Sequence, residues 1–331
     1  MRRGVWRGLL GLLLLVGNGG AARAQGAVSW ETWQHLTGAV DVGAPRSDGR
    51  LVAMAAGKLW LVAPDTGSMT AFSDYQGSVD GEPYLAVAQD GLNVTAAGCS
   101  FSRDDIYILD LTSPPGIARV DAQGQTTRVA TLNQVQTLGG IAFDTTGRFD
   151  HRLLVAGSIQ NREMLFALDC LGGVTVITDA APTMEGGMQV APETFGAFGG
   201  ALIGADENGG QVWAIDPDGT SRVVLVPTLP TGGDTGVESV GFIPAGGATA
   251  YLADRATANN PFPGTDSILR LPAQALGSIG VQEGDLLVAT EGGGTTVAIQ
   301  CRDTCTARTV AIGPAGGNVG HIEGHITLTT P

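Results

Sequence analysis

The chain has 331 residues, of which 43% are hydrophobic and 15% charged, and it contains 51 glycines and 16 prolines. This composition excludes an intrinsically disordered chain, because a sizeable core can be buried, and the glycine content indicates a turn-rich globular protein. The formal net charge of −14 excludes a surface built for nucleic-acid phosphates or anionic membranes.

The N-terminal segment predicts an export signal. Three arginines precede the apolar run 9–16, and Ala22-Arg23-Ala24 is the small-residue pattern at which signal peptidases cut. We therefore expect residues 1–24 to be removed and the mature protein to be periplasmic, extracellular or associated with the cell envelope. The apolar run is too short to span a bilayer and no second long one follows, so no transmembrane segment is predicted.

Residues 25–47 lie outside the repeat described below and are expected to form an N-terminal arm. Within it, residues 29–36 contain two tryptophans and fit either a short helical turn capped by Ser29 or a strand that docks on the rest of the fold. Packing is the expected role of both tryptophans. The remaining chain, 48–331, is predicted to be one domain.

A hairpin recurs along this domain. Three copies run from a strand through an Asp-x-x-Gly turn into a second β-rich stretch, and their turn aspartates are Asp121, Asp169 and Asp216, which are 48 and 47 residues apart. Weaker or degenerate copies lie at 64–67, 271–272 and 301–305. Self-similarity at a fixed period is the signature of a repeat architecture.

Two further strands precede the hairpins. Apolar second strands are expected at 51–55, 153–157, 202–206, 251–254 and 286–290. First strands are expected at 82–87, 140–143, 185–190, 238–242 and 323–327. Four strands in about 48 residues is the size of one propeller blade, and helical periodicity is almost absent. The sequence therefore predicts an all-β protein, a β-propeller of four-stranded blades.

The ends of the repeat predict how the ring closes. The last first strand has no hairpin after it, and the hairpins at 51–73 have no first strand before them. We therefore expect the C-terminal strand, 321–329, to join the N-terminal blade as its innermost strand, which removes a sheet edge. Six blades are favoured. The interval between Glu238 and Glu323 holds an irregular blade, whose inner strand could be 278–282, or else a ring of five blades has an inserted hairpin.

The four cysteines fit an oxidising compartment, and none of them forms the C-x-x-C pair of thioredoxin-like or zinc sites. Structural disulfides are therefore expected. Cys301 and Cys305 would close a three-residue hairpin turn, which makes them the preferred pair and leaves Cys99 with Cys170.

Three pieces of the repeat carry a resemblance to known propellers. They are Glu185-Gly-Gly-Met-Gln-Val-Ala-Pro192, the following Gly200-Ala-Leu-Ile-Gly-Ala-Asp206, and Gly139-Gly-Ile-Ala-Phe-Asp144. Together with the repeat of four-stranded units over residues 48–329, they resemble the six-bladed propellers of the SMP-30/gluconolactonase-like and NHL-repeat superfamilies. The resemblance implies the fold first, and function only by analogy.

In the lactonases of that superfamily a divalent cation, usually calcium, is held at the mouth of the channel by oxygens from the inner strands. Glu185 best resembles the family's metal-binding glutamate, and Glu82, Glu238 and Glu323 occupy the equivalent position in their own blades. Converging carboxylates would repel each other unless a cation or shared protons neutralised them. The alternative is that each glutamate only caps backbone N–H groups where its strand begins. The family's metal site also includes an asparagine, and this sequence has no asparagine at the matching position.

A second constellation is His321-Ile-Glu323-Gly-His325. In a strand, positions 321, 323 and 325 project to one face, so two imidazoles and a carboxylate could bind zinc or copper, or transfer protons. The alternative is a pair of interior histidines whose hydrogen bonds are satisfied where neighbouring blades pack.

Three functions fit these observations. The preferred one is an exported, monomeric propeller that binds a small molecule, a cation or a protein partner at its channel face without catalysis, because the family's full ligand set is missing. The second is a divalent-metal-dependent hydrolase or lyase of a lactone or small ester, in which the cation polarises the carbonyl and no catalytic residue is assigned. The third is a structural protein of the cell envelope. Calcium is preferred to zinc or copper as the cation, and nucleic acid is excluded as a partner.

Overall fold

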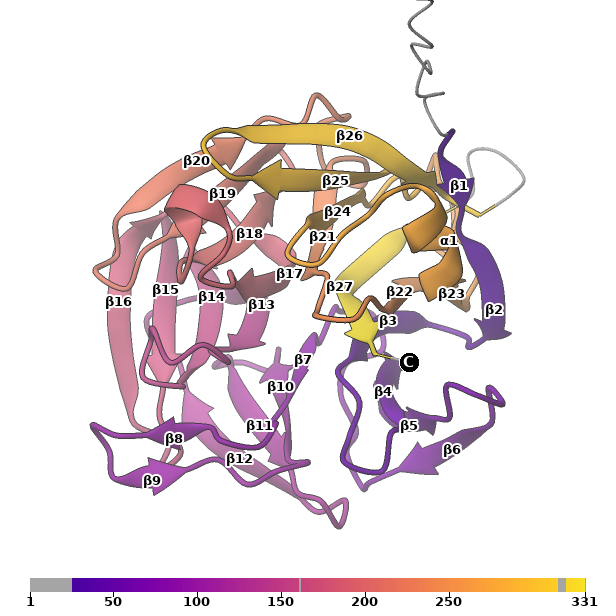
Figure 1. The fold of residues 1–331 in the computed structure, drawn as a ribbon. Helices are drawn as coiled ribbons and strands as arrows, with labels where there is room; N and C mark the ends of the chain where they lie inside the picture. Colours follow the sequence, from indigo (N-terminus) through magenta and orange to yellow (C-terminus); the bar gives the residue numbers. More distant parts are fainter. Residues whose placement is uncertain (1–25, 161, 315–319, 331) are drawn as a thin grey trace, which may run out of the picture.

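The computed structural model describes residues 26–160, 162–314 and 320–330, and the predicted export signal at 1–24 lies outside them. Over these ranges the chain is a β-propeller, with its sheets arranged around a common centre (Figure 1). Besides strands, the described residues form only the short helix α1 (Ala273–Ser278) and a 3-10 turn at Gly196–Phe198. None of the described helices is long and apolar enough to cross a membrane. The all-β prediction is confirmed.

Two four-stranded antiparallel sheets come first in the chain, and each starts at its innermost strand. One consists of β3 (Ala39–Gly43), β4 (Leu51–Ala55), β5 (Lys58–Val62) and β6 (Met69–Phe72). The other consists of β7 (Leu85–Val87), β10 (Ile106–Asp110), β11 (Gly116–Val120) and β12 (Thr126–Thr131). The hairpin of β8 (Asn93–Val94) and β9 (Cys99–Ser100) is inserted between β7 and β10.

An eight-stranded sheet follows, made of two such meanders side by side. The first holds β13 (Thr137–Phe143), β14 (Leu153–Ile159), β15 (Arg162–Leu168) and β16 (Val174–Ala181). The second holds β17 (Glu185–Val190), β18 (Leu202–Asp206), β19 (Gln211–Ile215) and β20 (Ser221–Leu225). Their inner strands β13 and β17 pair in parallel, with Gly140 opposite Gly186.

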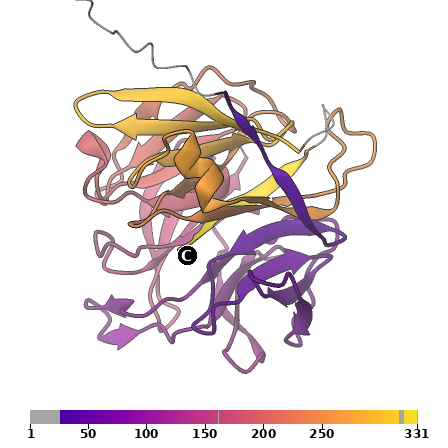
Figure 2. The ribbon, with the colours of Figure 1, turned by 45° about the vertical axis from the view of Figure 1, so that its right-hand side comes forward.

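The last two sheets interleave in the chain. One sheet holds β21 (Val237–Phe242), β24 (Leu286–Thr290), β25 (Thr296–Cys301) and β26 (Cys305–Ile312), with β1 (Val28–Ser29) parallel to β26 at its edge. The other holds β27 (Ile322–Thr329), β22 (Thr249–Asp254), β23 (Ser267–Leu271) and β2 (Glu31–His35). Figure 2 shows the indigo N-terminal segment running from the edge of β26 to the sheet of β22 and β23.

The ring closes differently from the prediction. The C-terminal strand is an innermost strand, as expected, but it pairs with β22, with Ala250 opposite Leu328, and not with the hairpins at 51–73. Those hairpins have their own inner strand, β3, which is buried along its whole length. Asp41 in the middle of β3 masks the apolar pattern that would have revealed the strand. The ring is sealed because β27 and β2, from opposite ends of the chain, lie in one sheet.

Two further expectations are corrected. Residues 278–282 form no inner strand, because α1 ends at Ser278 and a turn follows it. The inner strand of the sheet that contains β22 and β23 is β27. Of the predicted arm 25–47, the described residues 26–47 form no separate arm, because β1, β2 and β3 all belong to sheets of the ring. For 29–36 the strand alternative is confirmed. Trp30 is 1% exposed and donates its indole N–H to Oγ1 of Thr296 at 2.9 Å, so it packs as expected.

The predicted Asp-x-x-Gly turns close the hairpins. Oδ1 of Asp121 accepts hydrogen bonds from the backbone N–H groups two and four residues on, both at 2.9 Å, and Asp169 repeats this pattern at 2.9 and 2.8 Å. These bonds satisfy the turn backbone locally. In the third copy the carboxylate of Asp216 instead pairs with Arg222, at 2.9 Å.

The core lies between neighbouring sheets. The predicted apolar second strands are buried, and β4 and β24 are buried at every residue. Between two sheets the rings of Phe101, Tyr107 and Phe143 pack edge to face, with centroids 4.9–5.4 Å apart. Burying such surface contributes about 25 cal/mol per Å² and is the main stabilising term.

Both predicted disulfides are present. Cys301–Cys305 closes the β25–β26 hairpin. Cys99–Cys170 ties the β8–β9 hairpin to the turn after β15, in the neighbouring sheet. The Cys99–Cys170 disulfide therefore links two neighbouring blades covalently.

Candidate metal centre

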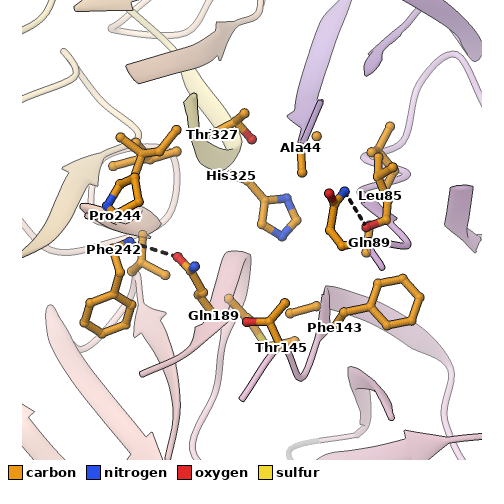
Figure 3. Close-up of a pocket in the computed structure, with 18 residues that line it drawn as sticks. Ala44, Leu85, Gln89, Phe143, Thr145, Gln189, Phe242, Pro244, His325 and Thr327 are labelled. Carbon is orange, nitrogen blue, oxygen red and sulfur yellow. Dashed lines mark hydrogen bonds between the residues drawn. The ribbon is translucent and has the colours of Figure 1, made fainter. Parts of the chain in front are cut away.

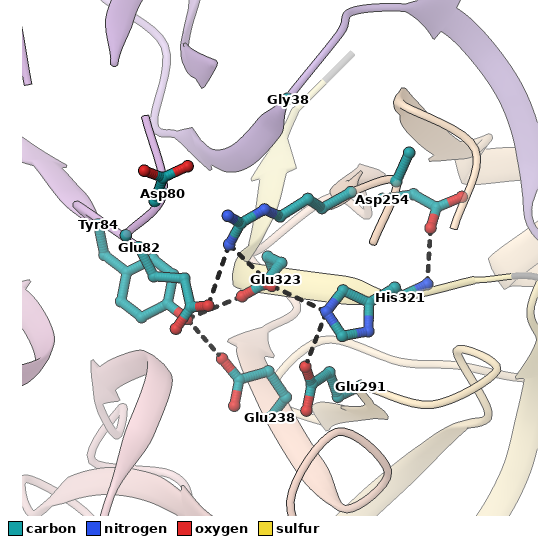
Figure 4. Close-up of polar contacts among 12 residues, drawn as sticks. Gly38, Asp80, Glu82, Tyr84, Glu238, Asp254, Glu291, His321 and Glu323 are labelled. Carbon is teal, nitrogen blue, oxygen red and sulfur yellow. Dashed lines mark hydrogen bonds and ion pairs between the residues drawn. The ribbon is translucent and has the colours of Figure 1, made fainter. Parts of the chain in front are cut away.

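The inner strands start at the same end of the central channel, and the predicted glutamates meet there. Glu82 precedes β7, Glu185 begins β17, Glu238 lies in β21 and Glu323 in β27, and all four line one cavity of about 260 Å³. Figure 4 shows Glu82, Glu238 and Glu323 at this cavity. The other lining residues are Tyr84, Glu207, Gly233, Asp234 and Glu291. We call this cavity the acidic mouth.

Several polar groups at the acidic mouth were missed in the sequence. Glu207, Arg255 and Glu291 are each the first residue after a second strand, namely β18, β22 and β24. Because second strands run antiparallel to inner strands, their ends lie beside the inner strands' starts. A polar residue directly after each apolar strand was the signal that could have found them. Asp234, in the loop before β21, carries no such signal.

Two glycines allow the inner strands to approach one another. Gly186 and Gly324 each follow a glutamate of the acidic mouth and have φ angles of +69° and +68°, a conformation that other residues rarely adopt. A Cβ on Gly186 would collide with the carboxylate of Glu238, and one on Gly324 would collide with that of Asp41. The Glu-Gly pairs are thus a geometric requirement of the site.

The phenol of Tyr84 links two buried carboxyl groups. Its Oη lies 3.0 Å from Oε1 of Glu238 and 3.0 Å from Oε2 of Glu323, and these three residues are at most 2% exposed. A phenol has one proton to donate, so a second proton or a cation is needed where two carboxylates face it. Burial, together with the charge of Glu323, raises the pKa of Glu238 well above its usual range. Burial therefore favours the protonated form of Glu238.

Two basic side chains reach the acidic mouth. Arg255 places Nη1 3.1 Å from Oε1 of Glu82 and 3.7 Å from Oε1 of Glu323. His321 places Nε2 3.1 Å from Oε1 of Glu291 and 3.2 Å from Oε1 of Glu323. Against seven lining carboxyl groups, one arginine and one histidine leave a large excess of potential negative charge.

Burial and mutual repulsion favour the protonated forms of these acids. Burial, followed by the charges of Glu323 and Glu185, raises the pKa of Glu82 to about 7. Burial and the charge of Glu207 raise the pKa of Glu185 to about 7. Burial and the adjacent Glu207 raise the pKa of Glu291 to about 12. A bound cation would have to displace such protons.

The donor set fits a divalent cation. Oε1 of Glu207, in a residue 6% exposed, is buried without a hydrogen-bond partner, whereas Oε1 of Glu323 has only its ion pairs with His321 and Arg255. Unpaired buried carboxylate oxygens are costly, and such oxygens are the ligands that Ca²⁺ prefers. Ligand atoms of Asp234, Glu291 and His321 also lie within 4.8 Å of one another. This mixed oxygen and nitrogen set suits a transition metal as well.

His325 does not belong to this site. The predicted common face of positions 321, 323 and 325 is wrong, because the register of β27 shifts between Glu323 and Thr327. The ring of His325 instead places Nδ1 3.0 Å from Oδ2 of Asp41 and Nε2 2.8 Å from the carbonyl oxygen of Ile141. Both partners are acceptors, so both ring nitrogens carry protons and neither has a lone pair for a metal. His325 is therefore an interior histidine whose ring hydrogen bonds are satisfied, as the alternative interpretation expected.

No family model and no curated protein matches the sequence. Among solved structures, a protein of unknown function from Bacteroides thetaiotaomicron aligns over 88% of this chain and 64% of its own, with 13% identity and a TM-score of 0.50. A structure from Agrobacterium tumefaciens, provisionally assigned as TolB, aligns over 87% of both chains with 13% identity and a TM-score of 0.49. Virginiamycin B lyase from Staphylococcus aureus aligns over 83% of this chain and 85% of its own, with 12% identity and a TM-score of 0.44. At such identities a likeness concerns the fold alone.

Proposed function

We propose that the protein is an exported, six-bladed propeller that binds a divalent cation, Ca²⁺ in the first place, at the acidic mouth and takes its ligand there. The observation that carries the proposal is the charge of this buried cavity, with seven carboxyl groups against Arg255 and His321. Two disulfides support export, because such bonds persist in oxidising compartments. Six blades result when each four-stranded meander counts as one blade and the eight-stranded sheet as two.

The residues have distinct parts in this proposal. Glu185, Glu207 and Glu238 would hold the cation together with Glu323. Arg255 already pairs with the rim residue Glu82, which keeps that carboxyl at the edge of the cavity. The cation, when bound, supplies the positive charge that these acids lack and offers a ligand oxygen a Lewis acid.

Calorimetric titration of chelator-stripped protein with Ca²⁺ tests the proposal, with metal analysis of protein purified without chelator. We expect saturable binding, weakened about tenfold or more in Glu238→Gln, because a buried ligand is lost. Glu193→Gln is the matched control, since the Glu193 side chain is 65% exposed and away from the cavity. A protein that carries no metal, binds no Ca²⁺ and has the same thermal stability with and without chelator would contradict the proposal.

Hydrolysis of a lactone or small ester is a second candidate, and one observation favours it. Glu82 lies at the rim with a side chain 36% exposed, and its pKa is raised to about 7, mainly by burial. A carboxyl with such a pKa can accept a proton from water near neutral pH. The test is turnover of a panel of γ- and δ-lactones with and without chelator. We expect Glu82→Gln to abolish any metal-dependent turnover while Ca²⁺ still binds, and a lack of turnover leaves binding alone as the function.

A further inference from the structure

A second cavity, of about 210 Å³, lies at the other end of the channel (Figure 3). Its walls come from the C-terminal parts of the same inner strands and the residues just after them. We call it the neutral mouth, because His325 is the only titratable side chain among the described residues that line it. Gln89, Thr145 and Gln189 supply its other free polar groups.

The two mouths are separate. Between them the inner strands touch on the axis: a Cβ on Gly187 of β17 would lie 2.9 Å from the carbonyl oxygen of Gly324 and 3.0 Å from Cα of His325, both in β27. Backbone contact of this kind brings β17 and β27 together between the two cavities. We therefore expect a ligand at the neutral mouth to bind independently of a cation at the acidic mouth.

The walls of the neutral mouth suit an apolar ring. They include the apolar residues Leu85, Met188 and Pro244, together with Phe143 and Phe242, whose rings also pack against Phe101 and Phe195. Apolar and aromatic walls with a few placed polar groups are typical of small-molecule sites.

The amide groups at the neutral mouth have defined orientations. Nε2 of Gln89 donates to the carbonyl oxygens of Pro45 and Val87, at 3.2 and 3.3 Å, so its Oε1 is left as a free acceptor. Oε1 of Gln189 accepts from the backbone N–H of Phe242 at 2.8 Å, so its Nε2 is left as a free donor. In Figure 3 both amides and the hydroxyl of Thr145 surround the space beside the His325 ring. These assignments follow from the backbone partners, which cannot exchange donor for acceptor.

The cavity offers no charge to an ionised ligand. Both nitrogens of His325 are engaged by Asp41 and by the carbonyl oxygen of Ile141, and Asp41 is completely buried beside the ring. The positive charge of the imidazolium is therefore neutralised within the protein. An anion or a cation entering the cavity would lose its hydration without gaining a counter-charge.

We propose that the neutral mouth is a binding site for a small uncharged amide carried on an apolar ring. The ligand carbonyl accepts from Nε2 of Gln189, the ligand N–H donates to Oε1 of Gln89, and the ring contacts the apolar walls. The protein leaves one donor and one acceptor free, and an amide group carries the complementary acceptor and donor.

Three probes of almost equal shape test the proposal: benzamide, benzoate and benzamidine. Binding to the mature chain is measured by ligand-observed NMR titration, both with Ca²⁺ and with chelator. We expect benzamide to bind in about the millimolar range and the two ions to bind at least about tenfold more weakly. The result should be the same with and without Ca²⁺, so it is independent of the cation site. Equal binding of all three probes, or no binding of benzamide up to about 10 mM, overturns the proposal.

Gln189→Glu is the decisive variant. It keeps an oxygen for the N–H of Phe242, removes the free donor and adds a negative charge. We expect benzamide to bind about tenfold more weakly and benzamidine about tenfold more tightly than to the wild type. Gln89→Met, which removes the free acceptor, provides a second test if that variant does not fold, with a few-fold loss of benzamide affinity. Unchanged benzamide binding in the folded variants overturns the proposal, and Glu193→Gln serves as the control.

Discussion

The two mouths of the channel are built from the same inner strands but have opposite chemistry. The starts of these strands and the loops beside them gather seven carboxyl groups, whereas their ends offer apolar walls and two amides. In a ring of repeated strands, one position per blade faces the axis, so a glutamate repeated at that position becomes a cluster of like charges. The difference shows that a propeller sets the chemistry of each channel end by the position along the strand.

One buried carboxylate holds together inner strands that lie between the two mouths. Asp41 of β3 accepts hydrogen bonds from the backbone N–H groups of Leu85 and His325, at 2.8 and 2.9 Å, and from the His325 ring. It thereby joins β3, β7 and β27, which belong to three different sheets. The following variants test whether Asp41 keeps the two mouths apart and whether their chemistry differs as described.

The largest effect is expected from Asp41→Ala. The change leaves a buried imidazolium and two backbone donors without their acceptor, so the free energy of unfolding should fall by about 3–5 kcal/mol. Urea denaturation measures the loss. Asp48→Ala is the control, since its ion pair with Arg50 is 40% exposed on both sides and is worth at most about 1 kcal/mol. Equal losses in the two variants would show that Asp41 does not hold these inner strands together.

Saturating Ca²⁺ should stabilise the wild-type protein next most strongly. At one hundred times the dissociation constant the expected gain is about 2.7 kcal/mol, because the proposed Ca²⁺ site exists only in the folded chain. Thermal unfolding with Ca²⁺ and with chelator measures it. We expect the same gain in Thr145→Val, at the neutral mouth, and a clearly smaller gain in Glu238→Gln. A gain that is lost in Thr145→Val would mean that the two mouths are not independent.

The pH dependence of stability tests the electrostatics behind the acidic mouth. Glu163 of β15 is 8% exposed, and burial, with the charge of Glu185, raises its pKa from 4.5 to about 8. The folded state therefore holds this proton more tightly than the unfolded state, so the contribution to stability is complete below pH 4.5 and is lost as the pH rises through about 8. In metal-free protein, Glu163→Gln should remove about 1–2 kcal/mol of this decline. Parallel melting-temperature profiles for wild type and variant would refute the assignment.

The smallest expected effect is a gain in Ca²⁺ affinity. Arg255 pairs with Glu82 and Glu323 and would compete with the proposed cation for these carboxylates. We expect Arg255→Met to raise the Ca²⁺ affinity about two- to fivefold, corresponding to about 0.5–1 kcal/mol. Calorimetric titration at low ionic strength measures the change. A weaker affinity would indicate that Arg255 orders the ligands more than it competes with the cation.

Most of the fold could be predicted because the repeat is local. The Asp-x-x-Gly turns and the apolar second strands depend on neighbouring residues, and the Cys301–Cys305 pair closes a single hairpin. Strand β3 was missed because Asp41 interrupts its apolar pattern, and a buried aspartate is stable only with partners that come from other sheets. The order of the last two sheets was missed for a similar reason, since β27 pairs with a strand about 75 residues earlier in the chain.

By itself, the sequence determined the all-β propeller, the two disulfides and the four glutamates that begin inner strands, because each depends on a period or on a short loop. The tertiary structure decided which side chains share a cavity. It brought Glu207, Glu291, Asp234 and Arg255 to the acidic mouth and turned His325 away from it. The physical reason is that a bulge at Gly324 and antiparallel pairing set where side chains point, and both arise only when distant strands meet.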